Sequence, residues 1–381
     1  MALIRPSDGG TCAWEDVYVG LGSSSGAAAN ARWGDMAGKL ILTGDVNLMN
    51  VADPAIPFRQ VAAELHAADV VFGNLECCLH LPVRRSHDTE GFFADPQIGG
   101  EALRLGGFHA VGVANNVNYG ADNIAASLGV LDRFGVPHTG AGANLAAARA
   151  PAIVARNGLR VGVVQRSSVY WPTDHEAAAD SPGIAVIRGH TAYQVPTGRL
   201  VPGMPPPNRP GVPPLVVTWA DAAYLAEFQK DIAALRPQAD IVVASCHWGL
   251  GREPLQYMTD IAHAAIDAGA DIVMGHGPHS LLPIEIYKGR PIFYGLCNFT
   301  FATGHLGRKH SGWVGLLIDM TFERGVVAGC EFRFVRSNDN NETYLCRLPD
   351  EAETLADLTR RSERNGVKLA PEGDRVRVTA T

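Results

Sequence analysis

The stretch Leu40-Ile-Leu-Thr-Gly-Asp45-Val-Asn47 contains a short apolar run that leads into an acidic side chain. The later stretch Ile241-Val-Val-Ala-Ser-Cys-His247-Trp-Gly249 has the same form and leads into a histidine. Apolar, β-branched runs of this length are typical of strands. Segments with helical periodicity separate such runs from residue 39 onward, and this alternation predicts an α/β fold.

The same periodicity places the remaining elements. Strands are expected at Leu40–Thr43, Val70–Gly73, Ala110–Ala114, Ile153–Ala155, Arg160–Gln165, Ile241–Ser245, Ile272–Met274 and Pro291–Leu296. Helices are expected at Phe58–Ala67, Asp122–Phe134, Asp221–Leu235 and Leu255–Ala268. Gly135 and Gly269 are expected to end two of these helices, because glycine readily adopts the left-handed conformation found after a helix C-terminus.

Three regions are predicted from composition. Residues 1–38 are rich in Gly, Ser and Ala and are expected to form an arm or linker. Residues 39–335 form the expected catalytic domain, and residues 336–381 form a C-terminal extension with one amphipathic helix and a charged tail. Residues 195–214 hold eight of the 24 prolines, which exclude a central strand or a helix interior. This insertion is expected to run over the surface, either as a plain excursion or as a loop that covers a substrate.

Charge and cysteine usage exclude several classes of protein. The chain has 381 residues, with 32 Lys and Arg against 39 Asp and Glu, and 46% hydrophobic residues, which excludes a disordered chain. This acidic balance argues against a nucleic-acid partner, since phosphate neutralisation needs a basic stripe. Arg360, Arg361 and Arg364 are expected to form a solvated helix face instead.

The seven cysteines are odd in number and form no Cys-x-x-Cys pair, which argues against a disulfide framework and a thiolate zinc site. No apolar run approaches the roughly 18 residues of a membrane helix. The first residues also lack the uninterrupted apolar stretch of a signal peptide. These features predict a soluble, cytoplasmic protein with no membrane partner.

Five of the expected strands lead into a potential metal ligand. These side chains are Asp45 and Asn47, Glu76, Asn116, His247, and His276 with His279. Ligands bind at the carboxyl ends of strands in open α/β sheets, and donors of this kind suit Zn, Mn, Fe, Mg or Ca without distinguishing among them. Together they suffice for two divalent ions that share a bridging carboxylate. Alternation along a strand places Asp45 and Asn47 on the same side, if the strand extends that far.

In this order, the motifs resemble those of one known family. They are Gly44-Asp-Val46, Ala68-Asp-Val-Val-Phe-Gly-Asn-Leu-Glu76, Ala114-Asn-Asn116, His247-Trp-Gly249 and Gly275-His-Gly-Pro-His279, followed by Glu285-Ile-Tyr-Lys-Gly-Arg-Pro-Ile-Phe-Tyr294 and Asn298-Phe299. Residues 39–322 thereby resemble the CapA-like poly-γ-glutamate biosynthesis family, which is similar to the calcineurin-like metallophosphatases. The resemblance implies a single-domain, four-layer α/β/β/α sandwich with a metal centre at the strand ends. It also implies the metal ligands, which are Asp45, Glu76, Asn116, His247, His276 and His279.

Two departures from the family pattern concern the chemistry. Val117 follows Asn116 where the family usually has a histidine, which in the phosphatase relatives assists the leaving group or stabilises the transferring phosphoryl. Valine cannot donate a proton, and Asn118 could replace that histidine only as a neutral hydrogen-bond donor. Gly277 stands where the family often has a second consecutive histidine. The metal ligands are therefore retained while the phosphatase machinery is reduced.

A metal that binds a carbonyl oxygen acidifies the adjacent Cα–H, and a nearby base can then remove that proton. In its expected cytosolic, unanchored state and in its altered Asn-Asn-His motif, the chain resembles a branch of the family associated with lasso-peptide biosynthesis, whose members epimerise a residue of a precursor peptide at Cα. The resemblance implies a peptide epimerase whose partner is a ribosomal precursor peptide. The candidate acid/base groups are His279, His247, His87, Asp88 and Cys246.

Two other functions stay open at this point. One is a metallophosphoesterase or another hydrolase that uses a metal-activated water, and the other is a non-catalytic component of polymer biosynthesis. Trp171, Trp219 and Trp248 are candidate peptide contacts, with an ordinary structural role as the alternative for each.

Overall fold

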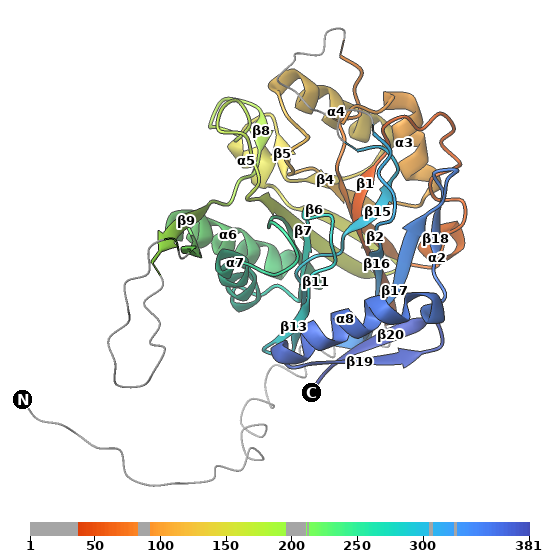
Figure 1. Ribbon diagram of the computed structural model, residues 1–381. Helices are drawn as coiled ribbons and strands as arrows, with labels where there is room; N and C mark the ends of the chain where they lie inside the picture. The colour runs from red at the N-terminus through yellow and green to blue at the C-terminus, as the bar shows by residue number, and fades with distance from the viewer. Residues whose placement is uncertain (1–36, 83–91, 196–210, 212, 305–307, 324–325) are drawn as a thin grey trace, which may run out of the picture.

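The computed structural model describes residues 37–82, 92–195, 211, 213–304, 308–323 and 326–381. Residues 1–36 of the expected arm at 1–38 and most of the proline-rich insertion lie outside these residues, and residues 37 and 38 begin β1 (Ala37–Asn47). The described chain forms two large sheets with helices on their outer sides (Figure 1). This arrangement confirms the expected α/β fold.

The larger sheet has ten strands. Its spatial order is β19 (Val367–Glu372), β20 (Arg375–Ala380), β17 (Val326–Ser337), β16 (Gly315–Glu323), β1 (Ala37–Asn47), β2 (Val70–Leu75), β3 (Ala110–Gly112) and β4 (His138–Thr139), with β15 (Asn298–Phe301) paired to β1 and β18 (Thr343–Leu345) paired to β17. Strands β1 to β4 run parallel, so their carboxyl ends share one edge. The expected C-terminal extension thus adds three strands to this sheet.

The smaller sheet has six strands. Its order is β13 (Ile284–Tyr287), β14 (Arg290–Phe293), β12 (Ile272–His276), β11 (Ile241–His247), β7 (Leu159–Ser167) and β6 (Ala152–Arg156). Every residue of β11 and β12 is buried, as expected for parallel strands covered on both faces. Two short ribbons accompany the sheets, β9 (Gly189–Gln194) with β10 (Leu215–Ala220) and β5 (Ala141–Gly142) with β8 (Gly183–Ile184).

The helices cover the outer faces of the sheets. They are α2 (Ala62–His66), α3 (Pro96–Leu105), α4 (Ala121–Phe134), α5 (Leu145–Arg149), α6 (Ala222–Leu235), α7 (Gln256–Asp267) and α8 (Ala352–Ser362), with 3-10 turns η1 (Arg236–Gln238), η3 (Leu348–Glu351) and η4 (Glu363–Asn365). The expected helix at 58–67 is shorter than predicted, because i→i+3 turns, such as the Val61 N–H to the Phe58 carbonyl at 3.0 Å, take the place of its first turn. No helix in the described part of the chain is long and apolar enough to cross a membrane.

Two apolar cores hold these layers together. The larger core contains inward-facing residues of both sheets, such as Leu42 of β1 and Val243 of β11. The second core lies between the smaller sheet and helices α6 and α7, and it includes Phe228, Ile261 and Val242. The smaller sheet is therefore packed on both of its faces.

A short crossing segment, residues 294–297 between β14 and β15, joins the two sheets at their carboxyl edge. Leu296 donates its N–H to the Gly275 carbonyl of the smaller sheet, at 2.9 Å. The next carbonyl, that of Cys297, accepts the N–H of Asp45 from β1 at 3.0 Å. A Cβ on Gly44 would lie 1.9 Å from the Cys297 oxygen, so only glycine fits at this crossing.

We predict that Gly44→Ala lowers the free energy of unfolding by about 1–3 kcal/mol, because the new methyl group forces β1 away from Cys297. Urea unfolding of the two proteins measures this change. Gly129 of α4 is the matched control, since a Cβ there meets nothing within 4 Å. Gly129→Ala should raise the stability by up to about 1 kcal/mol. Equal effects of the two substitutions would contradict the proposed tight crossing.

Candidate metal centre

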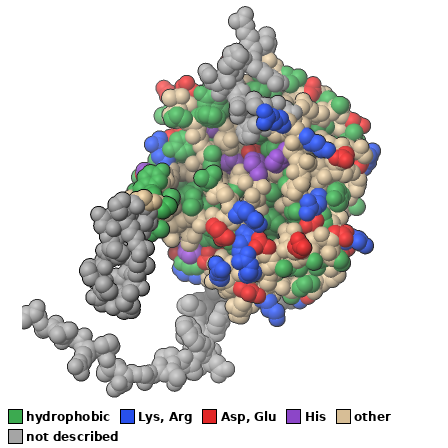
Figure 2. Space-filling view, viewed as in Figure 1, with side chains coloured by type: hydrophobic (Ala, Val, Ile, Leu, Met, Phe, Trp, Pro, Cys, Tyr) green, Lys and Arg blue, Asp and Glu red, His purple; other side chains and the backbone are tan. Residues whose placement is uncertain are grey.

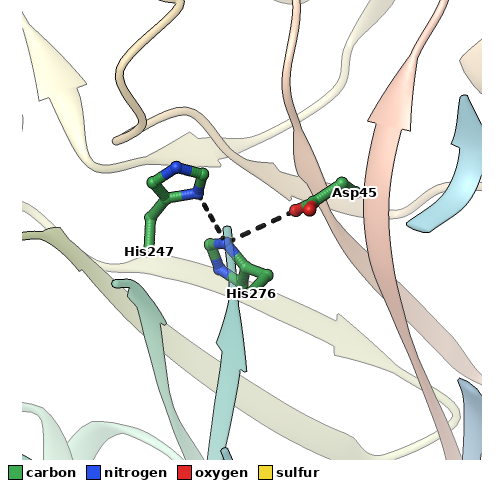
Figure 3. Close-up of side chains that lie close together, drawn as sticks. All are labelled: Asp45, His247 and His276. Atoms are coloured by element: carbon green, nitrogen blue, oxygen red, sulfur yellow. Dashed lines mark hydrogen bonds and ion pairs between the residues drawn. The ribbon is translucent and has the colours of Figure 1, made fainter. Parts of the chain in front are cut away.

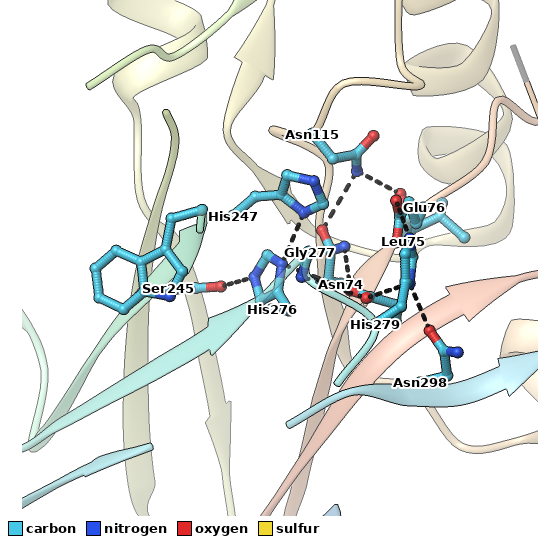
Figure 4. Close-up of polar contacts among 12 residues, drawn as sticks. Asn74, Leu75, Glu76, Asn115, Ser245, His247, His276, Gly277, His279 and Asn298 are labelled. Carbon is cyan, nitrogen blue, oxygen red and sulfur yellow. Dashed lines mark hydrogen bonds and ion pairs between the residues drawn. The ribbon is translucent and has the colours of Figure 1, made fainter. Parts of the chain in front are cut away.

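Polar side chains from both sheets converge where β1, β2, β11 and β12 end (Figure 4). Asp45, Glu76, His247 and His276 are each at most 1% exposed, and the His279 side chain is 27% exposed. Figure 2 shows histidine side chains gathered near the middle of one face of the molecule. The predicted carboxyl-end residues thus lie together at one place.

Asp45 lies at the centre of this group. Its Oδ1 accepts a 2.8 Å hydrogen bond from the Asn74 amide and is 3.6 Å from Nδ1 of His276. Its Oδ2 is 3.4 Å from Nδ1 of His279 and 3.4 Å from the backbone nitrogen of Gly277. The two oxygens of one carboxylate therefore face two different sets of side chains.

One set consists of Asp45, His247 and His276 (Figure 3). The two histidines bring their Nδ1 atoms within 3.0 Å of each other. The other nitrogen of His276 lies 2.9 Å from Ser245 Oγ, which fixes the orientation of the ring. Burial lowers the pKa of His276 to about 4, and burial together with His276 lowers that of His247 well below its usual value. Both rings are consequently neutral at physiological pH, as metal ligation requires.

The second set consists of Asp45, Glu76 and His279. Nδ1 of His279 is 2.8 Å from Asn298 Oδ1, which leaves Nε2 at 3.7 Å from Glu76 Oε1. Glu76 Oε2 is buried and has no hydrogen-bond partner. His279 also has a left-handed backbone with φ of +51°, a conformation that is uncommon outside glycine and concentrates at functional sites.

The electrostatics of this second set are dominated by carboxylates in a buried position. Burial, with the Asp45 charge beside it, raises the pKa of Glu76 well above its usual value. Burial opposes protonation of His279, but Glu76 and Asp45 outweigh it and raise the pKa of His279 to about 10. Burial likewise opposes ionisation of Asp45, yet His279 and the other two histidines lower its pKa. The Glu76–His279 pair therefore holds a proton near neutral pH.

These residues fit a divalent metal. Within each set, the donor atoms lie within 4.8 Å of one another. Carboxylate oxygens and imidazole nitrogens are the ligands of Zn, Mn and Fe sites, and the unpartnered Glu76 oxygen gains a partner if a cation lies between these donors. The clusters form a candidate metal site.

The other predicted ligands have different surroundings. Asn116 directs its Oδ1 at Nε2 of His247, at 2.7 Å, and so lies against a ligand candidate. The Asn47 amide nitrogen donates to the Thr303 carbonyl at 2.9 Å, and its Oδ1 accepts the Met49 N–H at 2.8 Å. The pairing of β1 with β15 also shifts in register between Asp45 and Val46, so the regular strand alternation does not continue from Asp45 to Asn47.

The candidate acid/base groups are only partly at the site. Cys246 belongs to the second apolar core, on the face of β11 opposite to Ser245 and His247. Burial also raises the pKa of its thiol, which disfavours a thiolate. His247 and His279 are in the clusters, whereas His87 and Asp88 lie outside the described residues.

The departures from the family pattern have structural counterparts. The Val117 side chain is 3% exposed and packs in the larger core. Asn118, the possible replacement donor, gives its amide to the Val113 carbonyl at 3.0 Å. Gly277 has φ of +113°, and a Cβ there would lie 3.0 Å from the Trp248 carbonyl oxygen. No side chain fits easily at position 277.

The three tryptophans differ in exposure. Trp248 is fully buried and donates to the Tyr294 carbonyl at 2.8 Å, so it does not contact a peptide on the surface. Trp219 is 44% exposed on β10. Trp171 is 42% exposed and donates its indole N–H to the Asn116 carbonyl at 2.8 Å. Of the three, Trp171 is thus tied to the loop that carries a ligand candidate.

Asn74, Gln165 and His175 are among the residues at the site that were not anticipated as functional. Asn74 donates to Asp45 and accepts from the Gln165 amide at 2.8 Å. His175 is buried, its Nδ1 accepts the backbone N–H of Trp171 at 2.9 Å, and its Nε2 lies 3.1 Å from the Asn118 carbonyl oxygen. A polar residue at the end of a buried strand is a usable signal for Asn74 and Gln165, but no local pattern identifies His175.

We predict that metal binding releases a proton and strengthens as pH rises. His279 is protonated in the metal-free protein below its pKa of about 10, so a metal must displace that proton. The association constant for Mn²⁺ should rise about tenfold per unit between about pH 6 and about pH 8. Calorimetric titration in buffers of different ionisation enthalpy counts the protons that are released. An affinity independent of pH would contradict this assignment.

Sequence comparison identifies relatives of the chain. Residues 28–303 match the family described as bacterial capsule synthesis protein PGA_cap. An uncharacterized protein y4sH of Sinorhizobium fredii is 29% identical over 309 residues, which cover 69% of this chain and 66% of that protein. The capsule biosynthesis protein CapA of Bacillus anthracis is 26% identical over 264 residues, covering 68% of this chain and 56% of that protein.

A solved structure described as a novel phosphatase of Mycoplasma pneumoniae is similar with a TM-score of 0.49 and 11% identity, covering 79% of this chain and 94% of that one. The matched region includes β1 to β15 and both clusters, whereas β16 to β20 and α8 lie beyond it. The chain belongs to the bacterial capsule synthesis PGA_cap family, the CapA-like family.

Proposed function

We propose that the protein is a divalent-metal-dependent acid/base enzyme that epimerises a residue of a ribosomal, lasso-type precursor peptide at Cα. Two features together carry this proposal. Two clusters of candidate metal ligands share Asp45, and position 117 is occupied by an apolar residue, Val117. A site of this kind keeps its Lewis acid and lacks, at that position, the proton donor that phosphoester cleavage uses.

The proposed centre is binuclear. Asp45 would bridge two ions, with His247 and His276 on one side and Glu76 and His279 on the other. When bound, the metal would withdraw electron density from a substrate carbonyl and acidify the adjacent Cα–H. Asn74 and the Gly277 N–H hold the Asp45 carboxylate in place, while Ser245 and Asn298 orient the histidine rings.

Epimerisation moves one proton off Cα and returns one to the opposite face, so it needs no oxidant and no leaving group. His247 and His279 are ligand candidates and are poorly suited to act as free bases as well. His310, half-buried with its ring 5.7 Å from that of His279, is a further titratable group beside the cluster. His87 and Asp88 remain candidates for the second group.

A hydrolase is the second candidate. The same shared carboxylate suits activation of a water for attack on a phosphoester or amide, and this chemistry does not depend on residue 117. The names of relatives in capsule biosynthesis leave a non-catalytic role in polymer assembly as a further alternative.

The proposed partner is an extended peptide, and exposed Trp171 beside Asn116 supports it, since tryptophan offers a large apolar contact surface. The cytoplasm is the proposed location. All six cysteines in the described part of the chain are free thiols, which is typical of reducing compartments.

We predict a metal stoichiometry that separates the two clusters. The wild-type protein loaded with Mn²⁺ and dialysed should retain two ions, Glu76→Gln one, and Asp45→Asn none, because only Asp45 belongs to both sets. Elemental analysis measures the content. Asp122→Asn, at an exposed position of α4, is the matched control and should keep both ions. Full metal content in Asp45→Asn would refute the bridging role.

We also predict solvent exchange at a single Cα. The Mn²⁺-loaded protein, incubated in deuterated water with candidate precursor peptides, should introduce deuterium at one Cα without cleaving the chain. Mass spectrometry detects the label, and Asp45→Asn should slow it at least about 100-fold while Asp122→Asn does not. Release of phosphate or of peptide fragments without exchange would instead favour the hydrolase.

A further inference from the structure

We propose that Arg361 of α8 is a positioning residue. It links the loop that follows β11 and His247 to the loop that follows β12 and contains His279. The expected effect on metal binding rests on the proposed metal centre, whereas the link between the loops rests on the hydrogen bonds of Arg361. Arg361 lies outside the residues 28–303 that match the family, so it assigns a role to the C-terminal part of the chain.

Arg361 is buried, with 6% of its surface exposed, contrary to the solvated position expected from the sequence. Helix α8 turns Leu358, Arg361 and Ser362 inward, and the helix lies against β13 at the edge of the smaller sheet (Figure 1). These positions share one helix face, since residues three and four apart are neighbours.

The guanidinium makes three hydrogen bonds in three directions. Nη1 donates to the Arg252 carbonyl at 2.9 Å, Nη2 to the Leu281 carbonyl at 3.0 Å, and Nε to Asp357 at 3.0 Å. A planar fork with five N–H donors can satisfy all three at once, whereas a lysine ammonium at the end of its flexible chain cannot reach the same three points in the same geometry.

The two carbonyls belong to the segments that follow the ligands. Arg252 is in the loop that leaves His247 and leads to α7, where Gly249 and Gly251 have φ of +87° and +76°. Leu281 follows His279 by two residues and pairs with Leu296 of the crossing segment. One side chain thereby links the loop after His247 to the loop after His279.

Neighbouring bonds reinforce the link. Asp357 also accepts from the Arg252 side chain at 3.1 Å, and Ser362 Oγ accepts the Ile284 N–H at 3.0 Å. Arg360 lies next to Arg361 and pairs with Asp357 too, but its side chain is 63% exposed and none of its hydrogen bonds in the described chain reaches either loop. Arg360 is thus a natural control of equal charge.

The experiment compares Arg361→Ala with Arg360→Ala, Arg361→Lys and Leu358→Ala. Leu358 is fully buried in α8, so its truncation loosens the helix without removing the bonds to the loops. Hydrogen exchange of the metal-free proteins is measured for residues 249–255 and 277–283, and Mn²⁺ affinity is measured by titration well below each melting temperature.

We expect faster exchange in both loops and a roughly tenfold weaker Mn²⁺ affinity for Arg361→Ala, the size of effect seen when residues that orient metal ligands are lost. Arg361→Lys should recover little of either property, and Arg360→Ala should match wild type. Leu358→Ala should lower the melting temperature without changing the affinity.

Unchanged exchange in both loops of Arg361→Ala would overturn the proposal, whether or not the protein binds metal. Equal affinities of Arg361→Ala and Leu358→Ala would also overturn it, since that result reduces Arg361 to a purely structural role. Wild-type protein that binds no Mn²⁺, Zn²⁺ or Fe²⁺ would refute the metal centre itself, and the exchange measurement would then decide the linkage of the loops separately.

Discussion

The close approach of β1 to the crossing segment at Cys297 is the constraint on which the site depends. Gly44 allows the Asp45 N–H to reach the Cys297 carbonyl, and the preceding residue, Leu296, bonds to Gly275 in the other sheet. Because Leu296 and Cys297 bond to the two different sheets, the Asp45 carboxylate lies between His276 of β12 and His279 of the loop that follows β12. A shift of either sheet would separate the two ligand clusters.

Burial makes this arrangement costly unless the charges are compensated. Asp45 is fully buried, and it is stabilised by the Asn74 amide and by histidines on two sides. Glu76 retains an oxygen without a partner, and burial favours its protonated form. Buried carboxylates without partners destabilise a fold, so a cluster of this kind is expected where a cation supplies the missing interaction.

The fold and the ligand-bearing strand ends were largely predictable. Buried parallel strands have a strong apolar signal, and helices α4, α6 and α7 have clear periodicity and end signals. Helix α3 was missed because Gly99 and Gly100 lie inside it, which normally disfavours a helix. Both glycines are needed there, since a Cβ would lie 2.5 Å from Leu79 Cδ2 and 2.3 Å from Phe134 Cδ2. Such close contacts have no signal in the local sequence.

The sequence by itself determined which strands end in candidate metal ligands and that residue 117 cannot donate a proton. Only the tertiary structure decided where these side chains point, since a strand places successive residues on opposite faces. It turned Cys246 into the second core and engaged Asn47 with the backbone at Thr303. It also divided the two oxygens of Asp45 between two clusters and buried Arg361, because these contacts join segments that are distant in the chain.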